Sequence, residues 1–523
     1  MIDLLEHICN NATINGKKPA ISRYYFDVDE VKLDKTASLT WKELIDAAYK
    51  IAVWMRREVS TKTPVVVFGH KNPLMIACFL GSVLSGRGYC PIDSSTPLER
   101  VSDIVSNIKP ELIFAFDDLN TLKTDAKVTT LGDIEAVAGN TAKMPTEEEI
   151  NNLPGIKEDD VWYIIFTSGS TGKPKGVQIT AANLRGFIDW GVTLLPNKDK
   201  DEQLTFMNQA PFSFDLSVMD TYLSLYTGGN LVLLNKETTG DMKCLMKTLS
   251  VSKINVWVST PSFADLCLPA TQLCEEEIPS IRTFLFCGEP LTKTTVKKLY
   301  ERFPNSLVVN TYGPTESTVA VTGVPMDEKA FSYEALPVGY ARKGTIICIE
   351  GEDGNALSDG EKGEIIICGD TVSIGYMNAL DLTEEKFVER EIDGTVYPAY
   401  HTGDVGYLDN GLLFCCGRMD HQIKLHGYRM ELDDIENNIL KLDEISWACV
   451  VPNKRNGKIS SLTAYVVKGD GTVGDFAEAQ ELKKRLKEFL PEYMIPKKIT
   501  FRDSLPLTGN GKVDRKALTG EER

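Results

Sequence analysis

The sequence predicts an α/β protein with a large N-terminal domain, residues 1–419, and a small α+β C-terminal domain, residues 420–523. A chain of 523 residues is too long for one compact core. Apolar, β-branched runs alternate with amphipathic stretches over most of its length. A charged, turn-rich segment near Asp420 interrupts this pattern, and we therefore place the domain boundary there.

The apolar runs of the N-terminal domain are predicted to be buried strands. Helix-like segments such as 291–303 separate several of them, and this alternation indicates parallel sheets covered by helices. The predicted strands are 64–69, 111–116, 161–168, 230–234, 254–260, 283–288 and 306–313.

The pattern changes between residues 335 and 415. Short strands, such as 363–368 and 411–417, are separated there by Gly and Asp turns, which predicts an antiparallel, barrel-like part. The C-terminal domain is expected to contain helices at 431–441 and 478–490 and strands at 447–452 and 461–467.

Charge and composition exclude several classes of protein. Lys and Arg number 57 against 74 Asp and Glu, a net charge of −17, which argues against nucleic acid or an anionic membrane as the main partner. The N-terminus, MIDLLEHICN, lacks the basic region of a signal peptide, and no apolar run is long enough for membrane insertion. The 12 cysteines form no CxxC pair and sit largely in apolar stretches, which is typical of reduced thiols in a cytoplasmic protein.

The segment YIIFTSGSTGKPKGVQIT, residues 163–180, is the strongest candidate for a phosphate-binding loop. Glycines allow backbone N–H groups to approach phosphate oxygens, while hydroxyls and lysines add donors and positive charge. The spacing to the lysine differs from a Walker A loop. The candidate residues are Thr167, Ser168, Gly169, Ser170, Thr171, Gly172 and Lys173.

This segment resembles the phosphate loop of the adenylate-forming superfamily, which includes acyl-CoA synthetases, luciferases and the adenylation domains of peptide synthetases. Further superfamily motifs follow in order: NTYGPTEST (310–318), YHTGDVGYL (400–408), GRMDHQIKLHGYRMEL (417–432) and LPLTGNGKVDRKAL (505–518). The resemblance implies an adenylate-forming N-terminal domain of two helix-covered sheets plus the barrel-like part, closed by a C-terminal lid. It also implies ATP and Mg²⁺ as cofactors.

The nucleotide-binding residues follow from these motifs. Tyr312 offers an aromatic face for adenine, Glu316 is a hard carboxylate suited to Mg²⁺, and Asp404 could accept the ribose hydroxyls. Arg418 could reach the phosphates or the ribose. The resemblance extends the ATP-binding set to Asn310, Thr311, Gly313, Pro314 and Thr315.

Lys512 is the candidate catalytic lysine, together with Glu316 and Thr167. On composition alone it is a solvated surface lysine, but the matching lysine of the superfamily bridges the substrate carboxylate and the phosphate. Adenylation brings two anions together, and a preplaced cation stabilises the charge that develops. No general base is needed, because the carboxylate is already ionised at pH 7.

Asp215 in an apolar setting indicates an amino acid substrate, because the matching aspartate in amino-acid-activating members accepts the α-ammonium. Segments 212–220, 259–268, 284–291 and 310–323 resemble members that charge a carrier protein with D-alanine for the (lipo)teichoic acid of the cell wall. Within that resemblance, Cys287 and Val319 form pocket walls beside the alanine methyl, and Asp215 and Lys512 pin its charged ends. The preference for D- over L-alanine rests on resemblance alone.

The resemblance also implies a second half-reaction. The lid would rotate about Asp420, withdraw Lys512 and bring Lys424, Gly427 and Tyr428 near the active site, with Gly427 leaving room for a phosphopantetheine arm. No carrier domain follows the lysine motif, so the carrier is expected to be a separate protein. Because such carriers are acidic, we expect docking on a local basic patch formed by Lys424, His426 and Arg429.

Other readings of the sequence stay open. The protein could be an adenylation domain for another small amino acid, an acyl-CoA ligase, or a nucleotide-binding protein without turnover. Asp215 argues against the acyl-CoA ligase, and Lys512, Glu316 and Asp404 argue against loss of turnover. The pair Cys415 and Cys416 has no physical explanation beyond strand packing, and the sequence predicts no oligomeric state.

Overall fold

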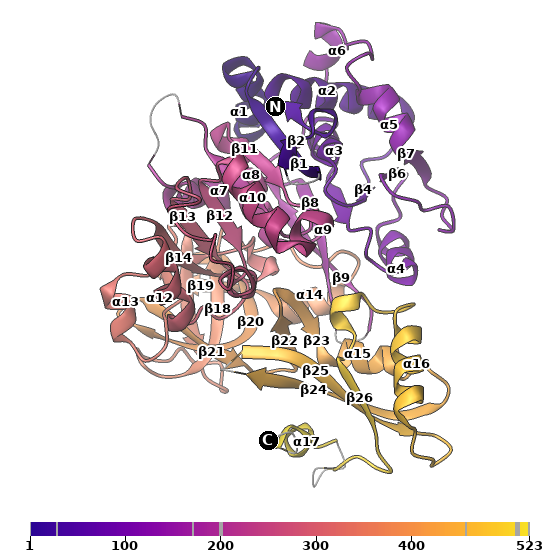
Figure 1. Ribbon diagram of the computed structural model, residues 1–523, viewed down its shortest axis with the longest axis vertical. Coiled ribbons are helices and arrows are strands. Elements are labelled where there is room, and N and C mark those ends of the chain that lie inside the picture. Colours follow the sequence, from indigo (N-terminus) through magenta and orange to yellow (C-terminus); the bar gives the residue numbers. More distant parts are fainter. Residues whose placement is uncertain are drawn as a thin grey trace. The chain divides into compact units, whose positions relative to one another are not determined.

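The computed structural model describes residues 2–27, 30–169, 172–197, 202–455, 458–507 and 513–520 (Figure 1). It consists of two compact units. The first contains the chain up to Asp93, Ile108–Ile165 and Val177–Gly417, and the second contains Ser94–Asn107, Phe166–Gly176 and the chain from Arg418 onward. The predicted domains 1–419 and 420–523 follow the chain rather than these units and stay a prediction.

A six-stranded sheet of order β7-β6-β4-β5-β8-β9 lies in the N-terminal part of the chain, and its pairs β7–β6, β6–β4, β4–β5 and β5–β8 are parallel. Its strands β4, β5 and β6 are fully buried, as expected of parallel strands covered on both faces, whereas β7 is largely exposed. The six strands are β4 (Val65–Phe68), β5 (Tyr89–Ile92), β6 (Leu112–Ala115), β7 (Lys127–Thr130), β8 (Val161–Thr167) and β9 (Lys175–Thr180). The strands predicted at 64–69, 111–116 and 161–168 are thereby confirmed.

The helices of this part begin at recognisable caps. Thr40 and Glu43 form a capping box at the start of α2, and Asn72 caps α3, whose first residue is Pro73. The helices are α1 (Asp3–Asn15), α2 (Trp41–Glu58), α3 (Pro73–Leu84), α5 (Leu131–Ala138), α6 (Glu147–Asn151) and α7 (Ala181–Gly191), with 3-10 turns η1 (Lys35–Ala37) and η2 (Val192–Leu194).

A second sheet of 15 described strands changes from parallel to antiparallel pairing between β14 and β15. Its first half consists of β1 (Pro19–Asp27), β2 (Glu30–Leu33), β3 (Leu39–Thr40), β10 (Thr205–Asn208), β11 (Asn230–Leu233), β12 (Val256–Ser259), β13 (Thr283–Phe286) and β14 (Leu307–Tyr312). The strands predicted at 230–234, 254–260, 283–288 and 306–313 are confirmed.

The antiparallel half corrects one expectation. The region 335–415 is antiparallel as predicted, but its strands extend the second sheet and form no closed barrel within the described residues. They are β15 (Thr322–Pro325), β16 (Gly339–Ala341), β17 (Thr345–Glu350), β18 (Gly363–Gly369), β19 (Phe387–Ile392), β20 (Thr395–Asp409) and β21 (Leu412–Arg418). The Gly and Asp turns specified hairpins, and hairpins can continue a sheet as readily as close one.

Helices follow the strands of the second sheet, including the predicted helix at 291–303. They are α8 (Leu216–Thr227), α9 (Lys236–Gly240), α10 (Met242–Ser252), α11 (Pro261–Cys267), α12 (Lys293–Arg302), α13 (Glu328–Ser332) and α14 (Leu380–Lys386), with the 3-10 turn η3 (Thr315–Ser317). Among the described helices, none combines the length and apolar character needed to cross a bilayer.

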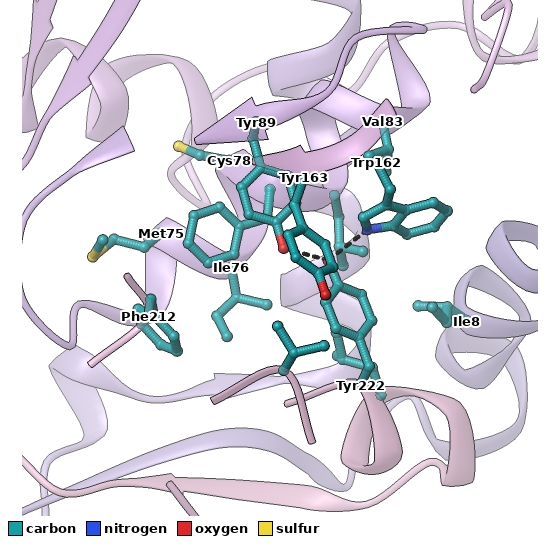
Figure 2. Packing of buried hydrophobic residues seen from close by; sticks show 14 of the residues in the cluster. Ile8, Met75, Ile76, Cys78, Val83, Tyr89, Trp162, Tyr163, Phe212 and Tyr222 are labelled. Carbon is teal, nitrogen blue, oxygen red and sulfur yellow. Dashed lines mark hydrogen bonds between the residues drawn. The ribbon is translucent and has the colours of Figure 1, made fainter. Parts of the chain in front are cut away.

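The core beneath α8 contains a hydrogen-bonded aromatic cluster (Figure 2). The Tyr222 hydroxyl lies 2.6 Å from the Tyr89 hydroxyl and accepts a hydrogen bond of 2.6 Å from Trp162 Nε1. The Tyr163 hydroxyl is also buried, but it has no hydrogen-bond partner among the described residues. Buried aromatic rings contribute large apolar areas, and their polar atoms need partners.

These contacts predict unequal effects for two conservative substitutions. Tyr222→Phe leaves the Trp162 N–H and the Tyr89 hydroxyl unpaired in the core, so we expect the free energy of unfolding to fall by about 1–3 kcal/mol. Tyr163→Phe removes a hydroxyl without a protein partner and should be close to neutral. Urea denaturation of both variants tests this, and equal destabilisation would contradict it.

The second unit combines helices with a three-stranded sheet and a separate hairpin. It contains α4 (Leu98–Ile108), β22 (Gln422–Leu425), β23 (Tyr428–Glu431), α15 (Leu432–Ile439), β24 (Ile445–Arg455), β25 (Lys458–Lys468), α16 (Phe476–Leu486), η4 (Glu492–Met494), β26 (Lys498–Phe501) and α17 (Arg515–Gly520). The predicted C-terminal helices and strands correspond to α15, β24, β25 and α16. Asp475 and Glu478 form a capping box that starts α16.

Candidate active site

The loop after β8 closes tightly on its own backbone. The Gly172 N–H donates to the Gly169 carbonyl at 3.0 Å, and a Cβ on Gly169 would meet the Lys173 carbonyl oxygen at 2.3 Å. Gly172 has a φ of +80°, which favours glycine. The glycines of the predicted phosphate loop are therefore required by its backbone, whereas Ser170 and Thr171 lie outside the described residues.

The hydroxyls of this loop differ in their bonding. Ser168 is buried within the second unit, where its Oγ accepts from the Glu431 N–H at 3.1 Å and donates to the Arg429 carbonyl at 3.4 Å. The Thr167 Oγ1 is buried and has no hydrogen-bond partner among the described residues. Lys173 is exposed. Thr167 is thus a donor without a described acceptor, as expected of a ligand-binding hydroxyl.

Tyr312 and Asp404, predicted from separate motifs, lie in direct contact. The Tyr312 hydroxyl donates to Asp404 Oδ2 at 2.6 Å, and both side chains are buried in the first unit. Burial, followed by the charge of Asp404, raises the pKa of Tyr312 well above its usual value. Tyr312 therefore stays a neutral donor, and the bond orients one oxygen of Asp404.

The residues before Tyr312 are held from inside the protein. Asn310 Nδ2 donates to the Pro337 carbonyl at 2.8 Å, and Thr311 Oγ1 donates to the Phe286 carbonyl at 2.8 Å. Gly313 permits close packing, since a Cβ there would lie 2.6 Å from Ala320 Cα. Pro314 then starts the turn η3, and these contacts fix the end of β14.

Glu316 lies fully buried in η3. Its Oε1 accepts a hydrogen bond of 2.8 Å from the Tyr376 hydroxyl, and its backbone carbonyl accepts from the Ser373 N–H at 2.8 Å. Sequence reasoning missed Tyr376, because no motif marks a residue 60 positions away as the partner of this carboxylate. The carboxylate is thus held in one orientation from a distant loop.

The side chain of Asp215 does not cap the helix that it precedes. Asp215 occupies the N-cap position of α8, yet its side chain makes no capping hydrogen bond. Its Oδ2 instead accepts from Thr315 Oγ1 at 2.7 Å. Thr315, predicted as an ATP-binding residue, therefore links the nucleotide segment to the predicted ammonium site.

The two predicted pocket walls also touch each other. Cys287 is buried, and its Sγ donates to the Val319 carbonyl at 3.6 Å. Thr318 and Val319 have φ values of +60° and +68°, and β-branched residues rarely adopt this left-handed conformation. The Thr318 hydroxyl anchors the segment on the Thr371 carbonyl at 2.8 Å. Such strain persists where the surrounding structure enforces it, and it is concentrated at functional sites.

Arg418 is paired with the predicted hinge residue. Its Nε and one terminal nitrogen donate to the two oxygens of Asp420, each at 2.7 Å. Burial opposes ionisation of Asp420, but the hydrogen bonds and charge of Arg418 outweigh it and lower its pKa. The roles of Arg418 in ATP binding and of Asp420 as a hinge stay predictions.

The strands β22 and β23 form a hairpin whose turn residues are His426 and Gly427. Both have positive φ, +54° and +86°, as in the primed turns that suit two-residue hairpins. Tyr428 stacks on Tyr493 with ring centroids 3.8 Å apart, and Arg429 Nε donates to Gln422 Oε1 at 2.7 Å. Sequence reasoning explained Gly427 only by space for a ligand and missed the turn. Lys424 lies opposite Arg429 in the hairpin, and Lys512 lies outside the described residues.

Comparison with known proteins defines the class. The family model described as "AMP-binding enzyme" matches residues 10–377, and the model of the C-terminal domain of these enzymes matches residues 434–512. The chain therefore belongs to the AMP-binding enzymes. Within them it is similar to the D-alanine–D-alanyl carrier protein ligases of Bacillus cytotoxicus and Bacillus cereus strain AH187. Each is 44% identical over 493 residues, which cover 93% of this chain and 95% of the relative.

Solved structures confirm the predicted fold class. The Vibrio cholerae adenylation domain AlmE, in complex with glycyl-adenosine-5'-phosphate, aligns with a TM-score of 0.81 and 22% identity, covering 99% of this chain and 97% of that one. The peptide synthetase protein PA1221, which contains adenylation and PCP domains, aligns with a TM-score of 0.78 and 24% identity over 98% and 83% of the two chains. At these identities the likeness concerns the fold alone.

Proposed function

We propose that this protein uses ATP to convert D-alanine to D-alanyl-AMP, with release of pyrophosphate, and then transfers the D-alanyl group to the phosphopantetheine thiol of a carrier protein. The observation that carries the proposal is Asp215, a helix N-cap residue whose carboxylate is held by Thr315 instead of capping its helix. The names of the relatives at 44% identity support the choice of substrate and partner.

In the first half-reaction an oxygen of the D-alanine carboxylate attacks the α-phosphorus of ATP. A phosphorus–oxygen bond forms, the bond to the β-phosphate oxygen breaks, and pyrophosphate leaves. Asp215 would pair with the α-ammonium, while Cys287 and Val319 would bound the methyl group. A methyl contributes only about 1–3 kcal/mol of discrimination, so selectivity depends on where these contacts direct it.

The phosphates would be held by donors of the loop after β8. Thr167 supplies a buried hydroxyl without a described acceptor, and the glycine backbone lets N–H groups approach the phosphate oxygens. Lys512 would neutralise charge on the reacting carboxylate and phosphate oxygens. Tyr312 and Asp404 would hold the adenosine, with Asp404 accepting from the ribose hydroxyls.

The carboxylate of Glu316 is suited to bind Mg²⁺. This carboxylate is buried and oriented by the Tyr376 hydroxyl, which donates to Oε1, and Mg²⁺ commonly binds through one or two carboxylates, water and substrate phosphates. When bound, the ion would lower the electrostatic cost of bringing two anions together.

In the second half-reaction the carrier thiol attacks the carbonyl carbon of D-alanyl-AMP. A carbon–sulfur bond forms, the bond to the phosphate oxygen breaks, AMP leaves, and the thiol proton passes to solvent. Asp420 would act as the hinge, and the hairpin bearing Lys424, Gly427 and Tyr428 would line the path of the thiol. We place this activity in the cytoplasm, where the 12 free cysteines would stay reduced and the product would feed D-alanylation of (lipo)teichoic acid.

The hairpin turn gives a prediction for the transfer step. Gly427→Ala forces a side chain into a left-handed conformation at a cost of about 1–2 kcal/mol, so we expect transfer from preformed D-alanyl-AMP to slow roughly tenfold. Gly411→Ala is the control, because it forces an alanine into a similar left-handed conformation, with φ of +77°, in the turn between β20 and β21, and it should preserve transfer. Single-turnover measurement of carrier loading tests this, and a wild-type rate for the alanine variant would contradict it.

Amino-acid-dependent pyrophosphate exchange tests the proposed function. D-alanine, L-alanine, glycine and L-serine are compared as substrates, and the carrier protein is then added to measure thioester formation. We expect D-alanine to be preferred. A preference for another amino acid, or turnover of a short fatty acid with CoA, would overturn the proposal.

A further inference from the structure

Lys71 is a fully buried lysine that no motif identifies. It follows β4, is 1% exposed and has a φ of +48°. Its ammonium donates to Asn208 Oδ1 and to the Ala210 carbonyl, and it lies 3.4 Å from the Asn208 carbonyl. An ammonium has three N–H donors, and these three oxygens can accept all of them.

The acceptors of Lys71 belong to the segment that leads to Asp215. The ammonium also lies 4.9 Å from the centre of the Phe212 ring, a cation–π contact. Phe212 in turn packs edge-on against Phe79, with ring centroids 5.5 Å apart, and Figure 2 shows Phe212 within the same apolar cluster. Lys71 thus holds the backbone of this segment at Ala210 and its first aromatic side chain.

Hydrogen bonds between residues close in sequence connect this segment to Asp215. The Phe214 N–H donates to the Pro211 carbonyl at 3.0 Å, and Ser217 Oγ donates to the Phe214 carbonyl at 2.6 Å. The Val218 N–H donates to the Asp215 carbonyl at 2.9 Å. The chain between Ala210 and α8 is therefore a sequence of bonded turns, and a shift at Ala210 would move Asp215.

A buried carboxylate balances the lysine. Asn208 Nδ2 donates to Asp220 Oδ1 at 2.7 Å, and Thr221 Oγ1 donates to the same oxygen at 3.2 Å. Burial lowers the pKa of Lys71 to about 7, against the opposing charges of Asp220 and Asp93. Burying such a pair seldom stabilises a protein more than apolar residues of the same volume would. Its presence here therefore needs a reason other than stability.

We propose that Lys71 is a positioning residue that fixes the segment Asn208–Phe212, so that the Asp215 carboxylate is already in place when the substrate ammonium arrives. This inference rests on the proposed function of Asp215 as the ammonium ligand. Misplacement of a binding group by a fraction of an ångström lowers affinity and rate even when its chemistry is unchanged.

Lys71→Met tests the role, because methionine fills much of the volume and cannot donate. In pyrophosphate exchange we expect KM for D-alanine to rise about tenfold to a hundredfold, with KM for ATP within about twofold of wild type. Lys50→Met is the matched control. Lys50 is also buried and donates to a backbone carbonyl, that of Gly139 at 2.9 Å, but on α2. The Lys50→Met variant should have a lower melting temperature, with KM for D-alanine and KM for ATP unchanged.

A double variant separates positioning from charge balance. Lys71→Met combined with Asp220→Asn removes the unpaired carboxylate, so stability should recover while KM for D-alanine stays high. The proposal would be overturned if the double variant recovered KM for D-alanine together with stability. It would also be overturned if Lys71→Met had a wild-type KM for D-alanine, or if its KM for ATP rose equally. If Lys71→Met does not fold, the double variant is measured alone. Wild-type enzyme that prefers another amino acid would refute the proposed substrate, and the Lys71 test would then use that amino acid.

Discussion

Replacing Asp215 with asparagine is expected to lower kcat/KM for D-alanine about 10²–10³-fold. Asparagine is nearly isosteric, and its Oδ1 can still accept from Thr315, so the local structure should survive. What disappears is the negative charge opposite the α-ammonium, and leaving a desolvated charge without its partner costs about 2–5 kcal/mol. The loss should be seen chiefly in KM for the amino acid.

The control for Asp215→Asn is another N-cap aspartate. Asp241 caps α10 by accepting from the Cys244 N–H at 3.0 Å, and asparagine is an equally good cap. Asp241→Asn should therefore leave activity and melting temperature unchanged. Pyrophosphate exchange and thermal denaturation of both variants provide the measurement. Undiminished D-alanine activation by Asp215→Asn would remove the basis of the proposed function.

Lys512→Ala is expected to reduce adenylation about 10²–10³-fold, as for other preorganised groups that stabilise developing charge. The same variant should transfer D-alanine normally from chemically prepared D-alanyl-AMP to the carrier, because the thiol attack does not require this cation. The split between the two half-reactions distinguishes a catalytic lysine from one needed for folding.

An exposed lysine nearby serves as the control for Lys512. Lys516 lies in α17, and Lys516→Ala should affect neither half-reaction. Burst measurements of pyrophosphate release and of carrier loading compare the variants. Equal loss of both half-reactions in Lys512→Ala would show that the lysine has another role.

The secondary structure was largely predictable because burial leaves a local pattern. Runs such as Val65–Phe68 and Leu112–Ala115 are wholly apolar, as expected of parallel strands buried on both faces. The antiparallel region was predicted as hairpins, but the sequence could not tell a closed barrel from a continued sheet, since closure depends on which edges pair over long distances. Local patterns do not encode those pairings.

The candidate site was predictable as a set of residues but not as a set of contacts. The contacts Tyr312–Asp404 and Thr315–Asp215 join residues 92 and 100 positions apart, each predicted from its own motif. Tyr376 and Lys71 were missed, because a lone tyrosine or lysine carries no signal until the fold places it against its partner. The hairpin turn at His426 and Gly427 was also missed, because Gly427 was interpreted as leaving space for a ligand and its backbone conformation was not considered.

The left-handed backbone at Thr318 and Val319 has a consequence for engineering this protein. Glycine at position 319 would release about 1–3 kcal/mol of conformational strain, and a screen for heat resistance would therefore favour it. The same exchange would delete the isopropyl side chain of Val319, the residue whose backbone carbonyl accepts a hydrogen bond from the Cys287 thiol. Because Val319 is proposed to bound the methyl group of the substrate, we expect heat-resistant variants selected in this way to accept larger amino acid side chains. Thermal stability and substrate selectivity would therefore have to be selected together.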